Sequence, residues 1–297
     1  MIDLEAKGGK SMRLEHIARR EGRLSSFLRG EMEMSTGLMN KLKWGDSIQV
    51  NGTTQHTDFP VKPGDRITVN LNEPEPQYPA EDGELTILWE DDHLLAVDKP
   101  SGMLIHPSRS CNSGTLANFV LGYYRRTGQK CAFHPITRLD RDTFGIVLLA
   151  KNAHVHARMS DLHSQGQLQK CYHALVLGTP EPAEGLIDAP VERLPLPSLL
   201  RKISPKGKPS QTRYRLLERL EGFSKLALWP ITGRTHQLRL HCAYIGCPIL
   251  GDPQYGGEAA LAAVSVPGQR LCAKSLRFRH PITGEEIYLE SKMNPEL

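Results

Sequence analysis

One short stretch of the chain combines residue types that do chemistry, residues 134–152, HPITRLDRDTFGIVLLAKN. Asp140 lies between Arg138 and Arg141, and an apolar run, residues 146–150, follows. The run predicts a buried strand, which would hold the aspartate on a rigid element. A guanidinium close by favours the ionised carboxylate that a nucleophile needs. The alternative is an ion-paired surface turn, whose charges contribute little.

A second stretch, KCYHALVLG, alternates in the manner of a strand, which places Tyr172 and Ala174 on the same face. Two interpretations of Tyr172 stay open at this point. It is a core tyrosine whose hydroxyl has a partner, or its flat ring stacks on a base.

A third stretch, residues 230–257, PITGRTHQLRLHCAYIGCPILGDPQYGG, gathers arginines and histidines ahead of a turn-rich segment. One interpretation is a metal site built from His236, His241, Cys242 and Cys247. The two histidines are five positions apart, a spacing that fits neither one helical face nor one strand face, and no CxxC pair accompanies them. The sequence therefore favours the wall of a basic groove, with Arg234, His236 and Arg239 on it.

A basic segment, residues 191–216, contains a single acidic residue, Glu192, before its final strand-like run. Proline, serine and glycine make much of it a loop. Its basic residues are either an ordinary solvated face or a device that contacts phosphates. They are Arg193, Arg201, Lys202, Lys206, Lys208, Arg213 and Arg215.

The whole chain is consistent with a globular protein of about two domains, since it has 297 residues, 39% of them hydrophobic. Its formal charge of +4 permits a polyanionic partner without arguing for one. No apolar region typical of a secretory signal opens it, and no run approaches the about 18 apolar residues of a membrane span. The six cysteines are scattered, which is typical of reduced thiols, so we expect a cytoplasmic protein without a membrane partner.

A proline-rich, acidic segment, residues 73–84, predicts a linker between two units. Before it, residues 1–72 predict a small domain in which two short helices, at 23–32 and 35–45, precede a small sheet, with Ser35 or Thr36 as an N-cap. After it, residues 85–297 predict a larger domain with helices from 114 and over 153–166. Strand-like runs lie at 85–89, 94–97, 146–150 and 171–178, and we group with them the later runs YRLLERL, SKLALWPI, LRLHCAYIG and EEIYLE. Because strands outnumber helices and do not alternate with them, the sequence predicts a mixed α+β sheet.

Taken together, these stretches resemble the RluA-type pseudouridine synthases, in the right order over roughly residues 85–291. RLDRDT before an apolar run, KCYHALVLG, and TGRTHQLRLH with GDPQYGG carry the resemblance. DHLLAVDKPSGMLIHP looks like the opening motif of that family, and RLCAKSLRFRHPITGEE looks like its closing one. Residues 22–70 resemble, more weakly, the S4-type RNA-binding module that often precedes this catalytic domain. That module's basic positions are here Met34, Ser35, Thr36 and Gly37.

The resemblance implies an α+β fold with a mixed, largely antiparallel central sheet flanked by helices, preceded by a small S4-like α/β domain. It implies that uridine in RNA is isomerised to pseudouridine without a cofactor or metal, by a monomer. Asp140 matches the essential aspartate of the family, Tyr172 the tyrosine that packs on the target ring, and Arg239 the arginine that pairs with the aspartate. Arg138 matches an arginine that fills the space of the flipped base. As RNA contacts we expect Arg138, Thr143, Arg201, Lys202, Lys206, Lys208, Arg234, His236 and Gln237.

Three positions depart from the family pattern: Thr137 and Cys272 stand where histidine is usual, and Phe144 stands where serine is common. These departures bear on the choice of substrate more than on the reaction. Ribosomal RNA is the expected partner, by analogy with the family, and transfer RNA is the alternative. A non-catalytic RNA-binding protein on the same fold and a metalloenzyme built on the 236–247 cluster are the competing functions.

Overall fold

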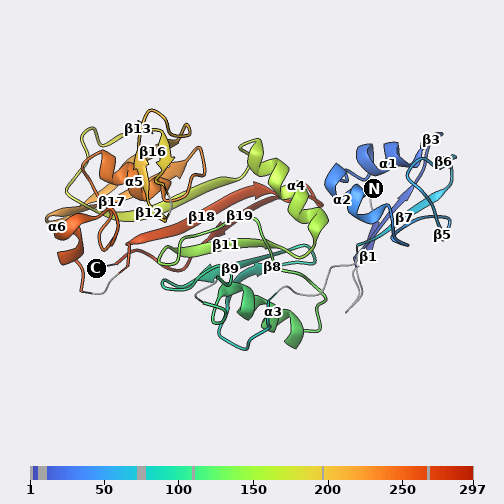
Figure 1. The fold of residues 1–297 in the computed structure, drawn as a ribbon, viewed down its shortest axis with the longest axis horizontal. Coiled ribbons are helices and arrows are strands. Elements are labelled where there is room, and N and C mark those ends of the chain that lie inside the picture. The colour runs from blue at the N-terminus through green and yellow to red at the C-terminus, as the bar shows by residue number, and fades with distance from the viewer. Residues whose placement is uncertain are drawn as a thin grey trace.

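The computed structural model describes residues 3–5, 12–71, 78–108, 111–195, 197–265 and 268–296. Figure 1 shows an N-terminal unit, residues 12–71 with the strand at 3–5, at one end of an elongated molecule. A larger body built around one long sheet makes up the rest.

The N-terminal unit has a hydrophobic core of its own, to which Phe27, Met32 and Ile67 contribute fully buried side chains. Both predicted helices are present, and the Ser35 hydroxyl caps the second by accepting a hydrogen bond from the Leu38 N–H at 3.2 Å. The sheet order is β1-β2-β7-β4-β5, so it includes strands ahead of the helices that the sequence analysis missed. The elements are β1 (Asp3–Glu5), β2 (Met12–Ile17), β3 (Gly22–Arg23), α1 (Leu24–Gly30), α2 (Thr36–Leu42), β4 (Ile48–Val50), β5 (Thr53–Thr54), β6 (Pro60–Val61) and β7 (Arg66–Leu71).

The larger body is built on a long sheet of order β13-β16-β17-β12-β18-β11-β9-β8, with β10 paired to β11 and β19 to β18. Neighbouring strands in this sheet run antiparallel, except that β11 and β18 run parallel in the described residues. This mixed, largely antiparallel sheet confirms the predicted α+β fold. The strands are β8 (Thr86–Glu90), β9 (Leu94–Lys99), β10 (His134–Pro135), β11 (Phe144–Ala150), β12 (Gln169–Leu177), β13 (Glu184–Asp188), β14 (Val191–Arg193), β15 (Arg201–Ile203), β16 (Gln211–Arg219), β17 (Phe223–Pro230), β18 (Leu271–Arg279) and β19 (Glu286–Glu290). The helices are α3 (Leu116–Arg126), α4 (Ala153–Ser164), α5 (Gln237–Tyr244) and α6 (Gly257–Ala262).

Helices α3 and α4 cover opposite faces of the sheet (Figure 1). Leu94 and Ala96 of β9 pack with Val155 of α4, whereas Leu95 of the same strand packs with Val120 of α3. Side chains alternate between the faces of a strand, so a run of apolar residues on β9 or β11 is buried on both sides. These two strands therefore form the rigid centre of the sheet.

The run LRLHCAYIG is a helix, α5, and its grouping with the strands was wrong. Residues 237–242 are all buried, so no polar face marks the helical period in the sequence. Tertiary packing, and not a local pattern, identifies this helix.

The predicted linker, residues 73–84, is described only from Tyr78 onwards, and residues 73–77 lie outside the described ranges. Residues 78–84 run along α3, where Gly122 makes room for them: a Cβ atom there would lie 1.8 Å from the carbonyl oxygen of Glu81. Next to the N-terminal unit, α4 packs Ala153 against that unit's core and pairs Arg158 with Glu33. The division into domains at 1–72, 73–84 and 85–297 stays a prediction. Each helix in the described ranges is too short or too polar to cross a bilayer.

Candidate active site

The loop between β10 and β11 carries Asp140, and the sheet holds this loop at both ends. At its start, the Thr137 hydroxyl accepts a hydrogen bond from the backbone N–H of Leu148 on β11 at 2.9 Å. Leu139 is buried in the core beneath α3, so its neighbours Arg138 and Asp140 face outward. The side chain of Asp140 keeps 30% of its surface exposed, which leaves it open to a ligand.

The end of the same loop is fixed by close contact between β11 and β18. Gly145 has a φ of +105°, and a Cβ atom there would lie 2.5 Å from the carbonyl oxygen of Ala273. Only glycine fits such a backbone position. The residue before it, Phe144, pairs in register with Cys272, so two of the three departures from the family pattern are neighbours in the sheet.

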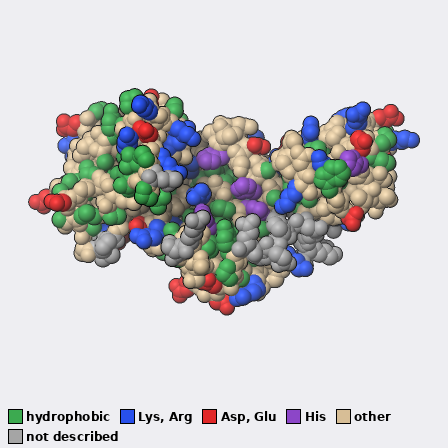
Figure 2. Space-filling view, in the orientation of Figure 1, with side chains coloured by type: hydrophobic (Ala, Val, Ile, Leu, Met, Phe, Trp, Pro, Cys, Tyr) green, Lys and Arg blue, Asp and Glu red, His purple; other side chains and the backbone are tan. Residues whose placement is uncertain are grey.

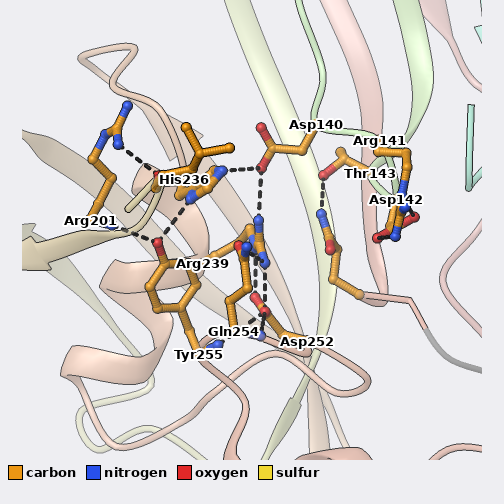
Figure 3. A network of polar contacts seen from close by, with 12 residues as sticks. Asp140, Arg141, Asp142, Thr143, Arg201, His236, Arg239, Asp252, Gln254 and Tyr255 are labelled. Atoms are coloured by element: carbon orange, nitrogen blue, oxygen red, sulfur yellow. Dashed lines mark hydrogen bonds and ion pairs between the residues drawn. The ribbon is translucent and has the colours of Figure 1, made fainter. Parts of the chain in front are cut away.

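Arg239 on α5 joins the Asp140 loop to the other half of the sheet (Figure 3). Its Nη1 donates to Oδ2 of Asp140 at 3.2 Å. Its Nε and Nη2 each donate to Asp252 at 2.6 Å, and Nη2 also donates to Gln254 at 2.9 Å. Burial opposes the charge on this guanidinium, but the bonds to Asp252 and Asp140 prevail, and the pKa of Arg239 is raised. A permanent cation is therefore held against one side of Asp140.

A cavity of about 320 Å³ opens beside Asp140, a volume in the range of small-molecule sites. Asp140, Tyr172 and Arg239 all line it, together with Arg138 and Arg234. The β10–β11 loop, strand β12 and helix α5 thus place Asp140, Tyr172 and Arg239 around one space. In the view of Figure 2, histidine side chains gather in the hollow at the middle of the molecule, and lysine and arginine side chains lie on its flanks.

The ring of Tyr172 bridges the two halves of the sheet, since it packs against the apolar clusters on either side of β12 and β18. Burial raises the pKa of Tyr172, and the negative charge of Asp140 raises it further. The phenol therefore stays protonated at neutral pH and presents a flat, neutral ring to the cavity.

Comparison with known proteins points to one family. The sequence pattern of the family described as RNA pseudouridylate synthase matches residues 93–244. The uncharacterized RNA pseudouridine synthase YjbO of Bacillus subtilis is 34% identical over 273 residues, which cover 90% of this chain and 94% of that relative. The chain belongs to the RNA pseudouridylate synthase family.

Two further similarities support this assignment. Ribosomal large subunit pseudouridine synthase D of Nitrosomonas europaea is 35% identical over 237 residues, which cover 78% of this chain and 69% of that relative. Among solved structures, human RNA pseudouridylate synthase domain containing 1 superposes with a TM-score of 0.59 at 26% identity, covering 74% of this chain and 88% of that one. The enzyme is therefore an RNA pseudouridine synthase, which is an isomerase.

Two residues expected to contact RNA in this pseudouridine synthase are turned inward. Thr143 is 3% exposed, and its hydroxyl accepts a hydrogen bond from the Gln269 side chain at 2.9 Å. Gln237 is also 3% exposed, and its amide bonds to Thr232, Arg234, Gln211 and Thr212. Both side chains brace the walls of the cavity, so we leave them out of the RNA surface proposed below.

The basic segment forms a hairpin, β14–β15, and a following turn. Lys206 and Lys208 are exposed there, and Lys202 lies 3.5 Å from Glu192 with 52% of its side chain exposed. The Arg201 guanidinium donates to the backbone carbonyls of Leu199 and Leu200 at 2.7 and 3.1 Å, so it shapes its own loop. Lys202 therefore shares its charge with Glu192, whereas Lys206 and Lys208 present theirs at the exposed turn.

The residues of the metal alternative point to different places. His241 is buried and contacts Thr212 and the carbonyl oxygen of Ala189, while Cys242 and Cys247 lie in the apolar core. His236 lies apart from them and faces Asp140. Within the described residues, no group of three or more histidine, cysteine or acidic side chains is arranged to hold a metal ion.

The sequence analysis missed four residues that organise the site. Asp252, Gln254 and Tyr255, from GDPQYGG, surround Arg239, and only the density of turn residues drew attention to that segment. The fourth is Lys99, which is fully buried. Its Nζ donates to the carbonyls of Pro100, Met103 and Arg141 at 2.8, 2.9 and 2.8 Å. Burial lowers the pKa of Lys99 to about 8, against the pull of Asp142 and Asp140, and its third bond ties β9 to the Asp140 loop.

Proposed function

We propose that Asp140 is the catalytic carboxylate with which this enzyme converts uridine in ribosomal RNA to pseudouridine. The observation that supports the proposal is the pairing of Asp140 with Arg239 at 3.2 Å on the rim of the cavity. The reaction breaks the N1–C1′ bond and joins C5 to C1′, while C5 loses its proton and N1 gains one. An ionised carboxylate on a rigid loop is suited to act on the nucleoside during these steps.

The target nucleotide is proposed to leave the RNA helix and enter the cavity. A base inside a stacked helix is out of reach of a side chain, and turning it out costs a few kcal/mol. Stacking of the uracil on Tyr172 returns about 1–3 kcal/mol of this cost. Arg138 lies exposed on the same rim, which suits a side chain that fills the vacated position.

The phosphates on either side of the target are proposed to lie between Arg234 on the cavity wall and the β14–β15 hairpin. Arg234 lines the cavity and donates from Nε to the Pro209 carbonyl at 3.3 Å, next to the exposed Lys208. Contacts of this kind position an RNA without reading its sequence.

The test of catalysis is tritium release from RNA that carries 5-³H-uridine, prepared from cells that lack the gene. Bond formation at C5 expels the label, so the wild type should release it and Asp140→Asn should not, while both still bind RNA. Asp142→Asn is the matched control, because Asp142 is two positions away and pairs with Arg141. An Asp140→Asn variant with wild-type release would overturn the role of Asp140.

The choice of ribosomal RNA rests on the similarity to the Nitrosomonas europaea relative, which is named a ribosomal large subunit pseudouridine synthase. Pseudouridine mapping in cells with and without the gene tests it. Loss of one or more sites from large-subunit ribosomal RNA is expected. Loss confined to transfer RNA would contradict the proposed substrate and leave the reaction unchanged.

We also propose that the N-terminal unit is an S4-like module that adds RNA affinity. Its support is Trp44, 77% exposed just after α2, with Lys43 Nζ at 5.1 Å from the ring centroid and the His56 ring at 5.4 Å. An exposed tryptophan beside a cation is suited to stacking on a base. The cytoplasmic location and the monomeric state expected from the sequence stay predictions.

A further inference from the structure

The approach of His236 to Asp140 is the feature of the site that the reaction outlined above does not use. His236 Nε2 lies 4.0 Å from Asp140 Oδ2, on the rim of the cavity (Figure 3). Its other ring nitrogen, Nδ1, lies 2.8 Å from the hydroxyl of Tyr255. The backbone N–H of Arg201, on the basic hairpin, donates to the same hydroxyl at 3.0 Å.

This chain of contacts favours a proton on Nε2 of the His236 ring. The Tyr255 oxygen already accepts from Arg201, so its own hydrogen is free to go to His236 Nδ1. Nδ1 is then an acceptor, and in the neutral ring the proton lies on Nε2, which faces the carboxylate. The opposite tautomer would aim a lone pair at a negative oxygen. Both arguments give a neutral ring that points an N–H at Asp140.

The charges around the ring agree with the neutral form. Burial lowers the pKa of His236, and the positive charges of Arg239 and Arg201 lower it further. The negative charges of Asp140 and Asp252 raise it, but the pKa remains below its ordinary value. The side chain keeps only 13% of its surface exposed.

The backbone of His236 sets the direction in which its side chain leaves the chain. Its φ of 58° and ψ of 15° are left-handed, a conformation that is uncommon outside glycine and that histidine adopts more often than most residues. His236 precedes the first residue of α5, so this turn both starts the helix that carries Arg239 and directs the imidazole towards the loop.

We propose that His236 is a positioning residue for Asp140, and that Tyr255 locks its ring with the N–H directed at the carboxylate. The proposal rests on the proposed catalytic role of Asp140. Arg239 and His236 then hold the carboxylate from two sides. At 4.0 Å the contact is longer than a hydrogen bond, and a closure of about 1 Å when RNA enters the cavity would form one.

Two substitutions at His236 distinguish donation of a hydrogen bond to Asp140 from a purely structural effect of the left-handed backbone at this position. In His236→Gln the amide NH₂ lies where Nε2 was and can still donate to Asp140. In His236→Asn the amide reaches only the position of Nδ1, yet asparagine tolerates the left-handed backbone better than glutamine does. If His236 acts as a hydrogen-bond donor to Asp140, the glutamine variant should react faster than the asparagine variant. If only the left-handed backbone matters, the asparagine variant should react faster.

The experiment measures the single-turnover rate at saturating RNA, and separately the RNA dissociation constant, for these variants and for Tyr255→Phe. We expect His236→Asn to lose about 10- to 100-fold in rate, the worth of a hydrogen bond to a charged group. We expect His236→Gln to be about tenfold faster than the asparagine variant. Tyr255→Phe should lose rate and should add little further loss in combination with His236→Asn, since both changes act through one ring. Tyr288→Phe, at an exposed side chain of β19, is the control expected to match the wild type.

An asparagine variant as fast as the glutamine variant would overturn the proposal. Loss of RNA affinity alone, with the saturated rate unchanged, would also overturn it and make His236 an RNA contact. A Tyr255→Phe rate equal to that of the wild type would show that the Tyr255 hydroxyl does not fix the orientation of the His236 ring. Failure of the proposed function is distinguishable, because Asp140→Asn would then react at the wild-type rate. If only the role of His236 is wrong, Asp140→Asn stays inactive and the contradiction appears in the variants at His236 and Tyr255 alone.

Discussion

The guanidinium of Arg239 is shared between two carboxylates, and it binds the buried one more closely than the reactive one. Asp252 is fully buried and receives two bonds of 2.6 Å, whereas Asp140 receives one of 3.2 Å. Arg239 is therefore anchored by Asp252, and its remaining nitrogen is presented to Asp140. The tight pair sets the geometry, and the looser one leaves the catalytic carboxylate free to meet a substrate.

This arrangement predicts that Asp252→Asn is costly to stability as well as to activity. The substitution leaves the buried Arg239 charge with only the longer contact to Asp140, and breaking a buried ion pair costs about 3–5 kcal/mol. We expect a loss of this order in the free energy of unfolding in urea, together with a much slower reaction. Glu286→Gln is the control: Glu286 and its partner Arg277 are 65% and 53% exposed, so breaking that pair should cost less than about 1 kcal/mol. Equal losses in the two variants would contradict the anchoring role.

The β14–β15 hairpin predicts a change in the salt dependence of RNA binding. Lys206 and Lys208 are exposed, and each phosphate contact to a single strand adds about 0.7 to the slope of log K against log salt. Lys206→Gln and Lys208→Gln should each reduce the slope by about this amount. Arg126→Gln, which removes a cation paired with Asp82 at the end of α3, should leave the slope unchanged. An unchanged slope in both lysine variants would place the phosphates elsewhere.

The N-terminal unit predicts an effect of Trp44→Ala on affinity and not on chemistry. If the ring stacks on a base, its loss should weaken RNA binding by about 1–3 kcal/mol, measured by fluorescence titration. The saturated single-turnover rate should stay at the wild-type value. Tyr288→Ala is a matched control, since Tyr288 is also exposed and has the Arg277 guanidinium at 5.4 Å from its ring centroid. Wild-type affinity in Trp44→Ala would argue against an RNA surface at this position.

Buried His154 predicts that acid destabilises the protein. It is 1% exposed, and burial, with the charges of Arg158 and His93, lowers its pKa from the ordinary 6.5 to about 4. The unfolded chain takes up this proton below pH 6.5, and the native protein does so only near 4. The free energy of unfolding is therefore not reduced by His154 above pH 6.5. As the pH falls from 6.5 to 4, it decreases by on the order of 3 kcal/mol.

The measurement for His154 is the free energy of unfolding across this pH range. His154→Gln should flatten the acid side of the curve relative to the wild type. His56→Gln, at a histidine whose side chain is 54% exposed, is the control expected to keep the wild-type slope. A His154→Gln curve parallel to that of the wild type would show that the native ring takes up its proton as readily as the unfolded one.

The local elements of this protein could be predicted from its sequence where a local pattern specifies them. The apolar run after Asp140 is β11, and the helical spacing over 153–166 is α4, because one element is buried on both faces and the other on one stripe. The candidate catalytic residues could also be found in the sequence, since each of the short motifs RLDRDT, KCYHALVLG and HQLR contains its characteristic residues within a few positions.

Only the tertiary structure decided which of these residues meet. Asp140 and Arg239 are 99 positions apart, and no local pattern records that β11 and β18 run parallel or that α5 begins beside the Asp140 loop. The same folding turned Thr143 and Gln237 inward, where their polar groups find protein partners, and brought Asp252 and Tyr255 to the site. A sequence pattern reports which face of an element is buried, but the partner on that face is chosen by packing among distant segments.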